Sequence, residues 1–219
     1  MDNKKYQAII FDLDGTLINS IPDIADSMNR ILLKHGYQEY DYDQYKYFVG
    51  NGIKRLVEIC IPDKNKSERE TDIIFDLMIE EYGRNCLHKT YVYDGISDLL
   101  NDLSLRNIKM AVLSNKADSI TRKICDELFC SWNFEIILGA TDNFPKKPDP
   151  TAALFVADKL LVSPENIFYL GDTSIDMKTA SAANFFPAGA SWGFRPEEEL
   201  INSGAKFIAH TPSDCLRFF

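Results

Sequence analysis

Short apolar runs alternate with longer stretches of helical spacing in the part of the chain that follows residue 91. Short apolar runs predict buried strands, and apolar positions three or four residues apart predict helices. Together with an apolar run at 8–11, strands are predicted at 109–113, 134–138, 167–170 and 206–208, and helices at 96–105, 119–128, 150–161 and 174–183. This alternation is typical of the α/β class, in which helices cover both faces of a parallel sheet.

A long helical segment separates the first predicted strand from the others. Residues 22–35 have apolar side chains at helical spacing and end before Gly36, and further helices are predicted at 42–48, 53–59 and 67–82. The segment contains no convincing strand pattern. We therefore predict a Rossmann-like parallel-sheet core formed by residues 1–18 and 92–219. An all-helical cap domain, residues 19–91, is inserted into it through linkers near 19–21 and 89–95.

Polar side chains follow three of the predicted strands at the point where each strand ends. The first strand runs into Asp12 and Asp14, the second into Ser114, Asn115 and Lys116, and the third into Gly171 and Asp172, with Asp176 four residues later. In open α/β sheets, ligands bind beyond the carboxyl ends of the strands. A single polar ending is an ordinary turn, but three at one edge of a sheet form a candidate site.

Asp12 and Asp14 form the first carboxylate pair. Residues two apart on an extended segment point the same way, so two carboxylates at this spacing repel each other unless a cation lies between them. Mg²⁺ prefers hard oxygen ligands and would stabilise the pair. The alternative is a polar end to the strand, with Gly15 as the turn residue.

Asp172 and Asp176 form a second pair, one just before a predicted helix and one in its first turn. Acidic residues at a helix N-terminus are also ordinary capping residues, so this pair alone is ambiguous. Beside Asp12 and Asp14, it completes an acidic cluster that Mg²⁺ would occupy.

A hydroxyl, an amide and a lysine complete the candidate site. Ser114 and Asn115 follow a strand, where they could also serve as a turn or helix cap. Lys147 lies between prolines that restrain the backbone, although most lysines are solvated and Lys146 is an equally near alternative. Asp149 is predicted to cap the following helix, with Pro150 at its first position.

The charge of the chain limits the classes of partner. The 24 basic and 33 acidic residues give a net charge of −9, which argues against binding to nucleic acid or to an anionic membrane. A phosphate substrate would be repelled by this overall charge, so a local divalent cation is expected to attract it. The charge alone does not identify the ligand; the motif resemblance given below implies a small phosphorylated metabolite, and the protein is expected to be a monomer or a homodimer.

Cysteine usage and the N-terminus indicate the compartment. The five cysteines are odd in number and lack paired C-x-x-C spacing, which favours reduced thiols over a disulfide framework. The apolar stretch that ends at Asp12 is too short for a signal peptide or a membrane span. A cytoplasmic protein is expected. The three histidines form no metal-like pair and are interpreted as structural or surface residues.

Taken together, these motifs resemble those of the haloacid dehalogenase-like hydrolase superfamily, and the helical insertion resembles the cap of that family. The resemblance rests on Asp12-Leu13-Asp14-Gly15-Thr16, Ser114-Asn115, Lys147-Pro148-Asp149-Pro150 and Gly171-Asp172 with Asp176. It implies that Asp12 forms an aspartyl-phosphate, that Asp14 is the general acid and base, and that Ser114 and Lys147 bind the phosphoryl group. It also implies Mg²⁺ held by Asp12, the Asp14 backbone carbonyl and Asp172, with Asp176 nearby or acting through water.

Within that superfamily, the chain resembles the phosphoglycolate phosphatase branch. This resemblance rests on two segments, Phe48-Val49-Gly50-Asn51-Gly52 of the cap and Ala190-Ser191-Trp192-Gly193-Phe194. The resemblance implies that Gly50, Asn51, Gly52 and Lys54 of the cap, with Asn115, bind substrate; Arg55 is the alternative to Lys54, and a plain turn is the alternative for the glycines. Asn184 replaces a usual glycine, a change that a left-handed backbone tolerates.

Several activities remain open on the same core. A carboxylate at Asp14 can protonate a leaving alcohol, which dehalogenation does not need, so a phosphatase is favoured, with 2-phosphoglycolate as the first guess. Hydrolysis of pyrophosphate or sugar phosphates is an alternative, and so is a sugar phosphomutase. A phosphonate-cleaving enzyme would need a cap lysine, and a non-catalytic binding protein would not need the full motif set.

Overall fold

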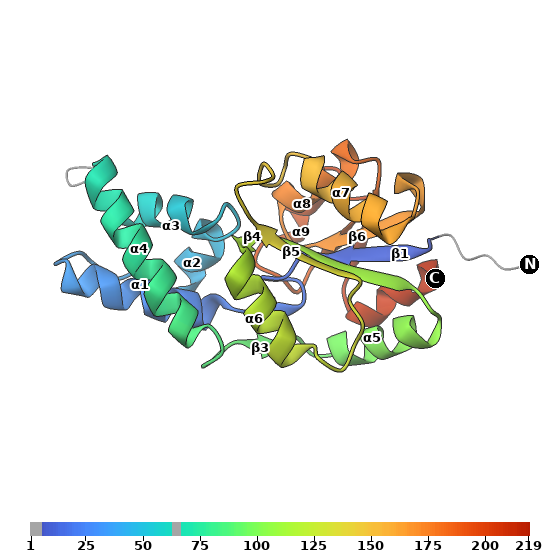
Figure 1. Ribbon diagram of the computed structural model, residues 1–219, viewed down its shortest axis with the longest axis horizontal. Coiled ribbons are helices and arrows are strands. Elements are labelled where there is room, and N and C mark those ends of the chain that lie inside the picture. Colours follow the sequence, from blue (N-terminus) through green and yellow to red (C-terminus); the bar gives the residue numbers. More distant parts are fainter. Residues whose placement is uncertain (1–5, 63–66) are drawn as a thin grey trace, which may run out of the picture.

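The computed structural model describes residues 6–62 and 67–219 and contains two parts, an α/β part and a helical part (Figure 1). The α/β part is built on a six-stranded sheet of order β5-β4-β1-β6-β7-β8 in which every neighbouring pair is parallel. The strands are β1 Ala8–Phe11, β4 Lys109–Ala117, β5 Ile136–Ala140, β6 Ile167–Gly171, β7 Phe186–Ala190 and β8 Phe207–Ala209. The predicted α/β class is confirmed.

Helices cover both faces of this sheet. The helices are α5 Ile96–Leu105, α6 Asp118–Leu128, α7 Thr151–Leu160, α8 Ser174–Ala182 and α9 Glu197–Asn202, with short 3₁₀ helices at Pro164–Asn166 and Pro212–Phe218. Figure 1 shows α7 and α8 on one side of the sheet and α5 and α6 on the other. Side chains of β1 alternate accordingly: Ala8 and Ile10 pack in one buried cluster, and Ile9 and Phe11 in the other.

Strand β7 is an element that the apolar pattern did not predict. Its sequence, Phe-Pro-Ala-Gly-Ala, contains the two residues that usually argue against a strand. Pro187 lies near the start of the strand, and the pairing with β8 begins one residue later, at Ala188. A Cβ on Gly189 would lie 2.8 Å from side-chain atoms of Leu200 and Ile208, so close packing requires the small residue.

Several element ends differ from the sequence prediction; β5, for example, occupies Ile136–Ala140 instead of 134–138, and two of the differences affect the candidate site. The predicted cap of α7 was wrong: Pro150 is the N-cap residue and Thr151 begins the helix, while the Asp149 carboxylate accepts from the Thr151 backbone N–H. Strand β4, predicted at 109–113, continues to Ala117. Ser114 and Asn115 therefore lie inside it, at an irregularity in its pairing with β5. Asn184 has a φ of +59°, the left-handed backbone expected there.

The helical part consists of α1 Ile21–Lys34, α2 Tyr42–Phe48, α3 Ile53–Cys60 and α4 Glu68–Asn85. Its four helices lie beyond the carboxyl edge of the sheet in Figure 1, with α1 and α4 side by side. Met28, Tyr45 and Met78, one from each of three helices, are fully buried between them. This is the all-helical insertion that the sequence predicts.

The two linkers of the insertion lie side by side. Strand β2, Ile18–Asn19, pairs antiparallel with β3, Tyr91–Val92. The buried carboxylate of Asp23 in α1 accepts from the backbone N–H groups of Lys89 and Thr90 and from Thr90 Oγ1. The predicted boundaries, 1–18, 19–91 and 92–219, stay a prediction, and their parts at 1–5 and 63–66 lie outside the described residues.

No helix within residues 6–62 and 67–219 combines the length and apolarity that crossing a bilayer requires. All five cysteines are free, and Cys130 is the exposed one.

Candidate active site

Three buried carboxylates converge at the carboxyl edge of the sheet. Asp12 directly follows β1, Asp172 directly follows β6, and Asp176 lies in the first turn of α8. Because β1 and β6 are neighbours, their ends meet. One oxygen atom from each of the three carboxylates lies within 4.8 Å of the other two, a spacing that suits three ligands of a single ion.

Two glycines make room for Asp172. A Cβ on Gly15 would lie 2.1 Å from Asp172 Oδ2, and a Cβ on Gly193 would lie 2.2 Å from Asp172 Cβ. Gly15 also has a φ of +87°, which side chains rarely tolerate. The carboxylate accepts from the Phe194 backbone N–H at 2.7 Å and from Thr16 Oγ1 at 3.3 Å, so its orientation is fixed.

The carboxylates repel each other in this dry environment. Burial, and then the charge of Asp176, raises the pKa of Asp12 to about 7, although Lys147 partly opposes this. Burial, and then the charges of Asp12 and Asp176, raises the pKa of Asp172 well above its ordinary range. Both shifts indicate that the cluster favours an added positive charge.

The donor set fits a hard divalent cation. Counting Asp14, four carboxylates face two ammonium groups, those of Lys116 and Lys147, among the described residues of the site. The excess of two negative charges matches one divalent ion, and carboxylate oxygens are the ligands that Mg²⁺ prefers. The cluster of Asp12, Asp172 and Asp176 is therefore a candidate metal site.

Lys147 is the buried cation of the cluster. Its Nζ donates to Asp12 Oδ1 at 2.8 Å and to Asp176 Oδ1 at 2.7 Å, and also to the Leu113 carbonyl at 2.9 Å. Burial would lower the pKa of this lysine, but the two carboxylates outweigh it and the pKa is well above its ordinary value. Lys146, the alternative lysine, is exposed.

Asn115 connects the Lys147 loop to the cap. Its Oδ1 accepts from the Lys147 backbone N–H at 2.9 Å, and its Nδ2 donates to the carbonyls of Lys147 and Gly50, each at 3.0 Å. Gly50 belongs to the glycine-rich cap segment singled out in the sequence. The amide thus holds this cap segment against the edge of the sheet.

The Asp14 carboxylate lies apart from the metal-like cluster. The group of three clustered carboxylates found among the described residues does not include it. It accepts from Ser20 Oγ at 2.5 Å, and each of its oxygens accepts from Lys116 Nζ at 2.8 Å. Because these contacts engage the side chain, a metal contact from this residue would come from its backbone carbonyl, as the sequence resemblance implies.

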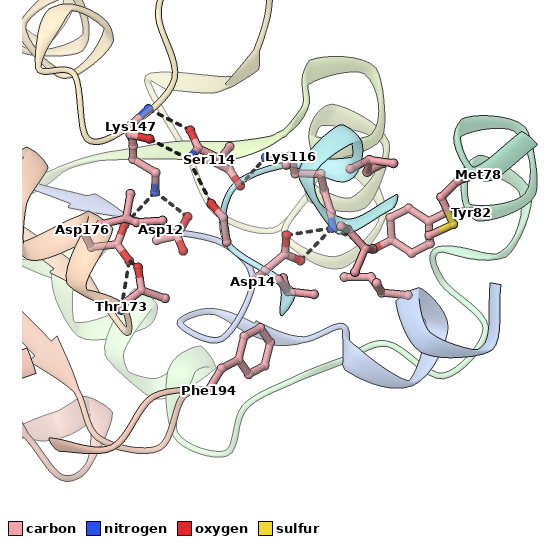
Figure 2. A pocket seen from close by; sticks show the side chains of 18 residues that line it. Asp12, Asp14, Met78, Tyr82, Ser114, Lys116, Lys147, Thr173, Asp176 and Phe194 are labelled. Atoms are coloured by element: carbon pink, nitrogen blue, oxygen red, sulfur yellow. Dashed lines mark hydrogen bonds and ion pairs between the residues drawn. The ribbon is translucent and has the colours of Figure 1, made fainter. Parts of the chain in front are cut away.

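A small cavity separates the sheet edge from the cap (Figure 2). Its free volume is about 40 Å³. The core lines it with Asp12, Asp14, Ser114, Asn115, Lys116, Lys147 and Asp176, and the helical insertion lines it with Val49, Gly50, Gly52, Ile53, Leu56, Met78 and Tyr82, among others. The candidate catalytic carboxylates and the lysine therefore face one cavity.

Two predicted cap residues do not reach this cavity. Lys54 Nζ pairs with Asp72 Oδ1 at 3.0 Å, where both side chains are about half exposed. Asn51 is exposed and does not line the cavity. Helix geometry explains the position of Lys54, because Ile53 and Leu56, three residues apart, share the face of α3 that lines the cavity.

The family described as haloacid dehalogenase-like hydrolase matches residues 9–190, most of the chain. The chain belongs to the haloacid dehalogenase-like hydrolases.

Relatives of this haloacid dehalogenase-like hydrolase share its full length. It is 33% identical over 211 residues to a phosphoglycolate phosphatase of Aquifex aeolicus (strain VF5), covering 96% of this chain and 95% of that protein. It is 28% identical over 221 residues to a phosphoglycolate phosphatase of Colwellia psychrerythraea, covering 99% and 98%. Its structure matches that of a predicted phosphoglycolate phosphatase of Haemophilus somnus 129pt with a TM-score of 0.89, 25% identity and 97% coverage of each chain.

Three side chains of this haloacid dehalogenase-like hydrolase hold the site or the adjoining end of α2, although no sequence motif assigned them a role. They are Lys116, Tyr82 and Arg195. Lys116 pairs with Asp14, and Tyr82 of α4 contacts Lys116. Arg195 donates to the carbonyls of Lys46, Tyr47 and Val49, at the end of α2. Lys116 could have been noticed because it directly follows the Ser114-Asn115 motif, but no local pattern marks the other two residues.

Proposed function

We propose that this protein is a Mg²⁺-dependent phosphatase that hydrolyses a small phosphomonoester through an aspartyl-phosphate on Asp12. The observation that carries the proposal is the shared cavity in which a buried Asp12, paired with Lys147 at 2.8 Å, lies beside the separate carboxylate of Asp14. One carboxylate is placed to attack and another to move a proton.

In the first step, an Asp12 carboxylate oxygen attacks the phosphorus atom and the bond from phosphorus to the alcohol oxygen breaks. Asp14 gives its proton to that oxygen, so the alcohol leaves neutral. Lys147 holds the attacking carboxylate and supplies positive charge to the phosphoryl oxygens, to which Ser114 donates a hydrogen bond.

In the second step, water attacks the phosphorus atom of the aspartyl-phosphate. Asp14, now a carboxylate, takes a proton from this water, and the bond from phosphorus to Asp12 breaks. Free phosphate and the starting Asp12 carboxylate result, and Asp14 again carries a proton. The cycle therefore closes without any further reactant.

Residues that would hold Mg²⁺ are Asp12, Asp172 and the Asp14 backbone carbonyl. The ion supplies charge neutralisation between the nucleophile and the phosphate dianion when it is bound. The Asp176 carboxylate accepts from Lys147, Tyr169 and Thr173, which supports a contact through water for this fourth acid.

The first substrate to test is 2-phosphoglycolate. Relatives named phosphoglycolate phosphatase share about a third of the residues along the full chain. Among residues 6–62 and 67–219, the lysines that line the cavity are Lys116 and Lys147 of the core, and this disfavours a phosphonate-cleaving enzyme with a cap lysine.

The experiment is a phosphate-release screen over small phosphoesters, pyrophosphate and sugar phosphates, with Mg²⁺ and with EDTA. Wild type is expected to need Mg²⁺, and Asp12→Asn is expected to lose at least about 1000-fold in kcat because no nucleophile remains. Asp14→Asn is expected to lose on the order of 100-fold or more.

Arg122→Met is the matched control, since Arg122 pairs with Asp118 on the exposed side of α6. Full turnover by Asp12→Asn would refute the covalent mechanism. Transfer of phosphate to a sugar without release of free phosphate would instead identify a mutase.

A further inference from the structure

The Asp14 carboxylate is held from two directions. Ser20, in the first linker, donates to Oδ1 at 2.5 Å, and the Lys116 ammonium lies 2.8 Å from both carboxylate oxygens. The Asp14 side chain is 12% exposed and that of Lys116 only 3%. Because water hardly reaches this ion pair, each partner strongly restrains the position of the other.

The third contact of the Lys116 ammonium comes from the cap. Its Nζ donates to the Tyr82 hydroxyl at 2.8 Å and lies 4.7 Å from the centre of the Tyr82 ring. An ammonium has three N–H donors, and the two oxygens of Asp14 and the phenol oxygen account for all three. The position of this ammonium is therefore set jointly by a core carboxylate and a cap phenol.

Tyr82 is anchored in the cap and points out of it toward the core. It lies on α4, is 1% exposed, and extends from that helix to Lys116 in Figure 2. Burial raises the pKa of this phenol well above its ordinary value, so its hydroxyl stays neutral beside the ammonium. If the cap moved away from the core, Lys116 would lose this oxygen while its contacts within the core remained.

We propose that Tyr82 and Lys116 are positioning residues through which the seated cap orients Asp14 for proton transfer to the leaving group. The proposal rests on the function proposed above, because Asp14 acts as a general acid and base only if the protein cleaves phosphoesters. Neither residue needs to touch the substrate. Tyr82 fixes the ammonium, and the ammonium fixes the carboxylate that faces the cavity.

Loss of this arrangement has a specific chemical signature. An alkyl phosphate such as 2-phosphoglycolate releases an alkoxide that must be protonated as the bond breaks. Acetyl phosphate, which is similarly small, transfers the same phosphoryl group to Asp12 but releases acetate, a stable anion that needs no proton. A misplaced Asp14 therefore slows aspartyl-phosphate formation from the first compound and not from the second.

Lys123 of the core provides a matched control, because it contacts the same cap helix. Its Nζ, which belongs to α6 of the core, donates to the carbonyl of Gly83 at 2.7 Å. Gly83 is the residue next to Tyr82, but this contact does not involve Asp14 or Lys116. Lys123→Met thus weakens the docking of the cap helix without changing the proposed route to Asp14.

The test measures aspartyl-phosphate formation in the first turnover, by rapid quench, with Mg²⁺ and each of the two compounds. Tyr82→Phe, which removes one oxygen atom, is expected to slow the reaction of 2-phosphoglycolate about 10-fold, a part of the full acid contribution. KM and the rate with acetyl phosphate should stay within about 2-fold. Lys116→Met should show the same selectivity with a larger loss, and Lys123→Met should resemble wild type.

Three results would overturn the positioning role while leaving the proposed function intact. They are equal losses with both compounds in Tyr82→Phe, no loss at all in that variant, and the same selective loss in Lys123→Met. By contrast, a wild-type protein that forms no aspartyl-phosphate from either compound and releases no phosphate from any ester would refute the proposed function itself, and the positioning role with it.

Discussion

Asp172 owes its place to two neighbours that have no side chain. Gly15 and Gly193 flank the carboxylate so closely that a methyl group on either would overlap it. Such positions decide whether a buried acid can face a metal, because a displaced carboxylate changes both the ligand distance and the repulsion within the cluster. The motif Asp12-Leu13-Asp14-Gly15-Thr16 and the segment that ends in Phe194 thus shape one small volume together.

Gly193→Ala should therefore damage the candidate metal site. Its new Cβ would lie 2.2 Å from Asp172 Cβ and 2.6 Å from the Gly15 carbonyl oxygen, which belongs to the backbone and cannot rotate away. We expect a loss of about 1–3 kcal/mol in the free energy of unfolding, measured by urea denaturation, and at least about 10-fold weaker Mg²⁺ binding by calorimetry.

Gly83→Ala is the matched control for that substitution. No atom lies within 4 Å of the position of its added Cβ, and Gly83 lies within α4. This variant should bind Mg²⁺ normally and gain up to about 1 kcal/mol in stability, because alanine restricts the unfolded chain and favours the helix. Normal Mg²⁺ binding by Gly193→Ala would show that Asp172 is not a ligand.

At the scale of elements, Arg195 joins the core to the end of α2. Its guanidinium donates to the carbonyls of Tyr47 and Val49 at 3.1 and 3.0 Å and also to that of Lys46. The last carbonyls of a helix have no partner within the helix, so a cation there satisfies them and the helix dipole together. Phe194, the preceding residue, holds Asp172 through its backbone N–H.

Arg195→Met should release this end of the cap while keeping the aliphatic stem. A charged hydrogen bond of this kind contributes about 2 kcal/mol, so local opening at the end of α2 should become about 30-fold easier. The measurement is amide hydrogen exchange of Val49, whose N–H donates to the Tyr45 carbonyl. Arg122→Met should leave that exchange rate unchanged, and an unchanged rate in Arg195→Met would mean that the contact is weak.

How far the sequence predicts the elements depends on where their signals lie. Helix α5 and strand β6 carry complete local patterns and were predicted within a residue. Strand β7 was missed because its sequence contains Pro187 and Gly189, which normally disfavour a strand. It forms because it pairs with β6 and packs closely against α9 and β8, and these contacts leave no local sequence pattern. The carboxylates were found in the same way as α5 and β6, because Asp12, Asp14 and Asp172 lie just beyond strand ends; Ser114 and Asn115 lie inside β4, and Lys147 lies in a turn.

Contacts between distant segments could not be predicted by that route. Lys116 and Asp14 are 102 positions apart, and Tyr82 belongs to a helix that reads as an ordinary amphipathic segment. Lys54 follows the glycine-rich segment but faces solvent. Ile53 lies on the side of α3 that lines the cavity, whereas Lys54 and Arg55 lie on the exposed side. The cap side of the site therefore required the structure.

For the whole molecule, the acidic cluster links stability to pH and to metal. Burial and the charge of Asp176 raise the folded pKa of Asp12 to about 7, above its value in the unfolded chain. Between these two values the folded protein binds more protons than the unfolded one, so the metal-free protein loses stability from this group as pH rises through that window. A bound divalent cation would oppose the loss, because it would balance the charge of the buried carboxylate and its repulsion by Asp176.

Mg²⁺ should accordingly stabilise the protein more at pH 8 than at pH 5. With saturating Mg²⁺, we expect Tm at about pH 8 to exceed that in EDTA by roughly 5–10 °C, with little difference at about pH 5. Asp12→Asn, which cannot ionise, should show a flatter pH dependence in EDTA and a smaller response to Mg²⁺. An equal Mg²⁺ effect at both pH values would separate the cluster from metal binding.

The pairing of β2 with β3 has a consequence for how this architecture can vary. Ile18 and Val92 are partners in that pair of strands, so the chain leaves the α/β core and returns to it at one place. The inserted segment can therefore be exchanged as a unit. Replacing it with another helical segment, or with a short turn, between β2 and β3 would leave the strand order and the buried acids in place. If the proposed function holds, exchanging this segment would change which side chains meet the alcohol and would also replace Tyr82, while Asp12, Asp172 and Asp176 would be inherited unchanged.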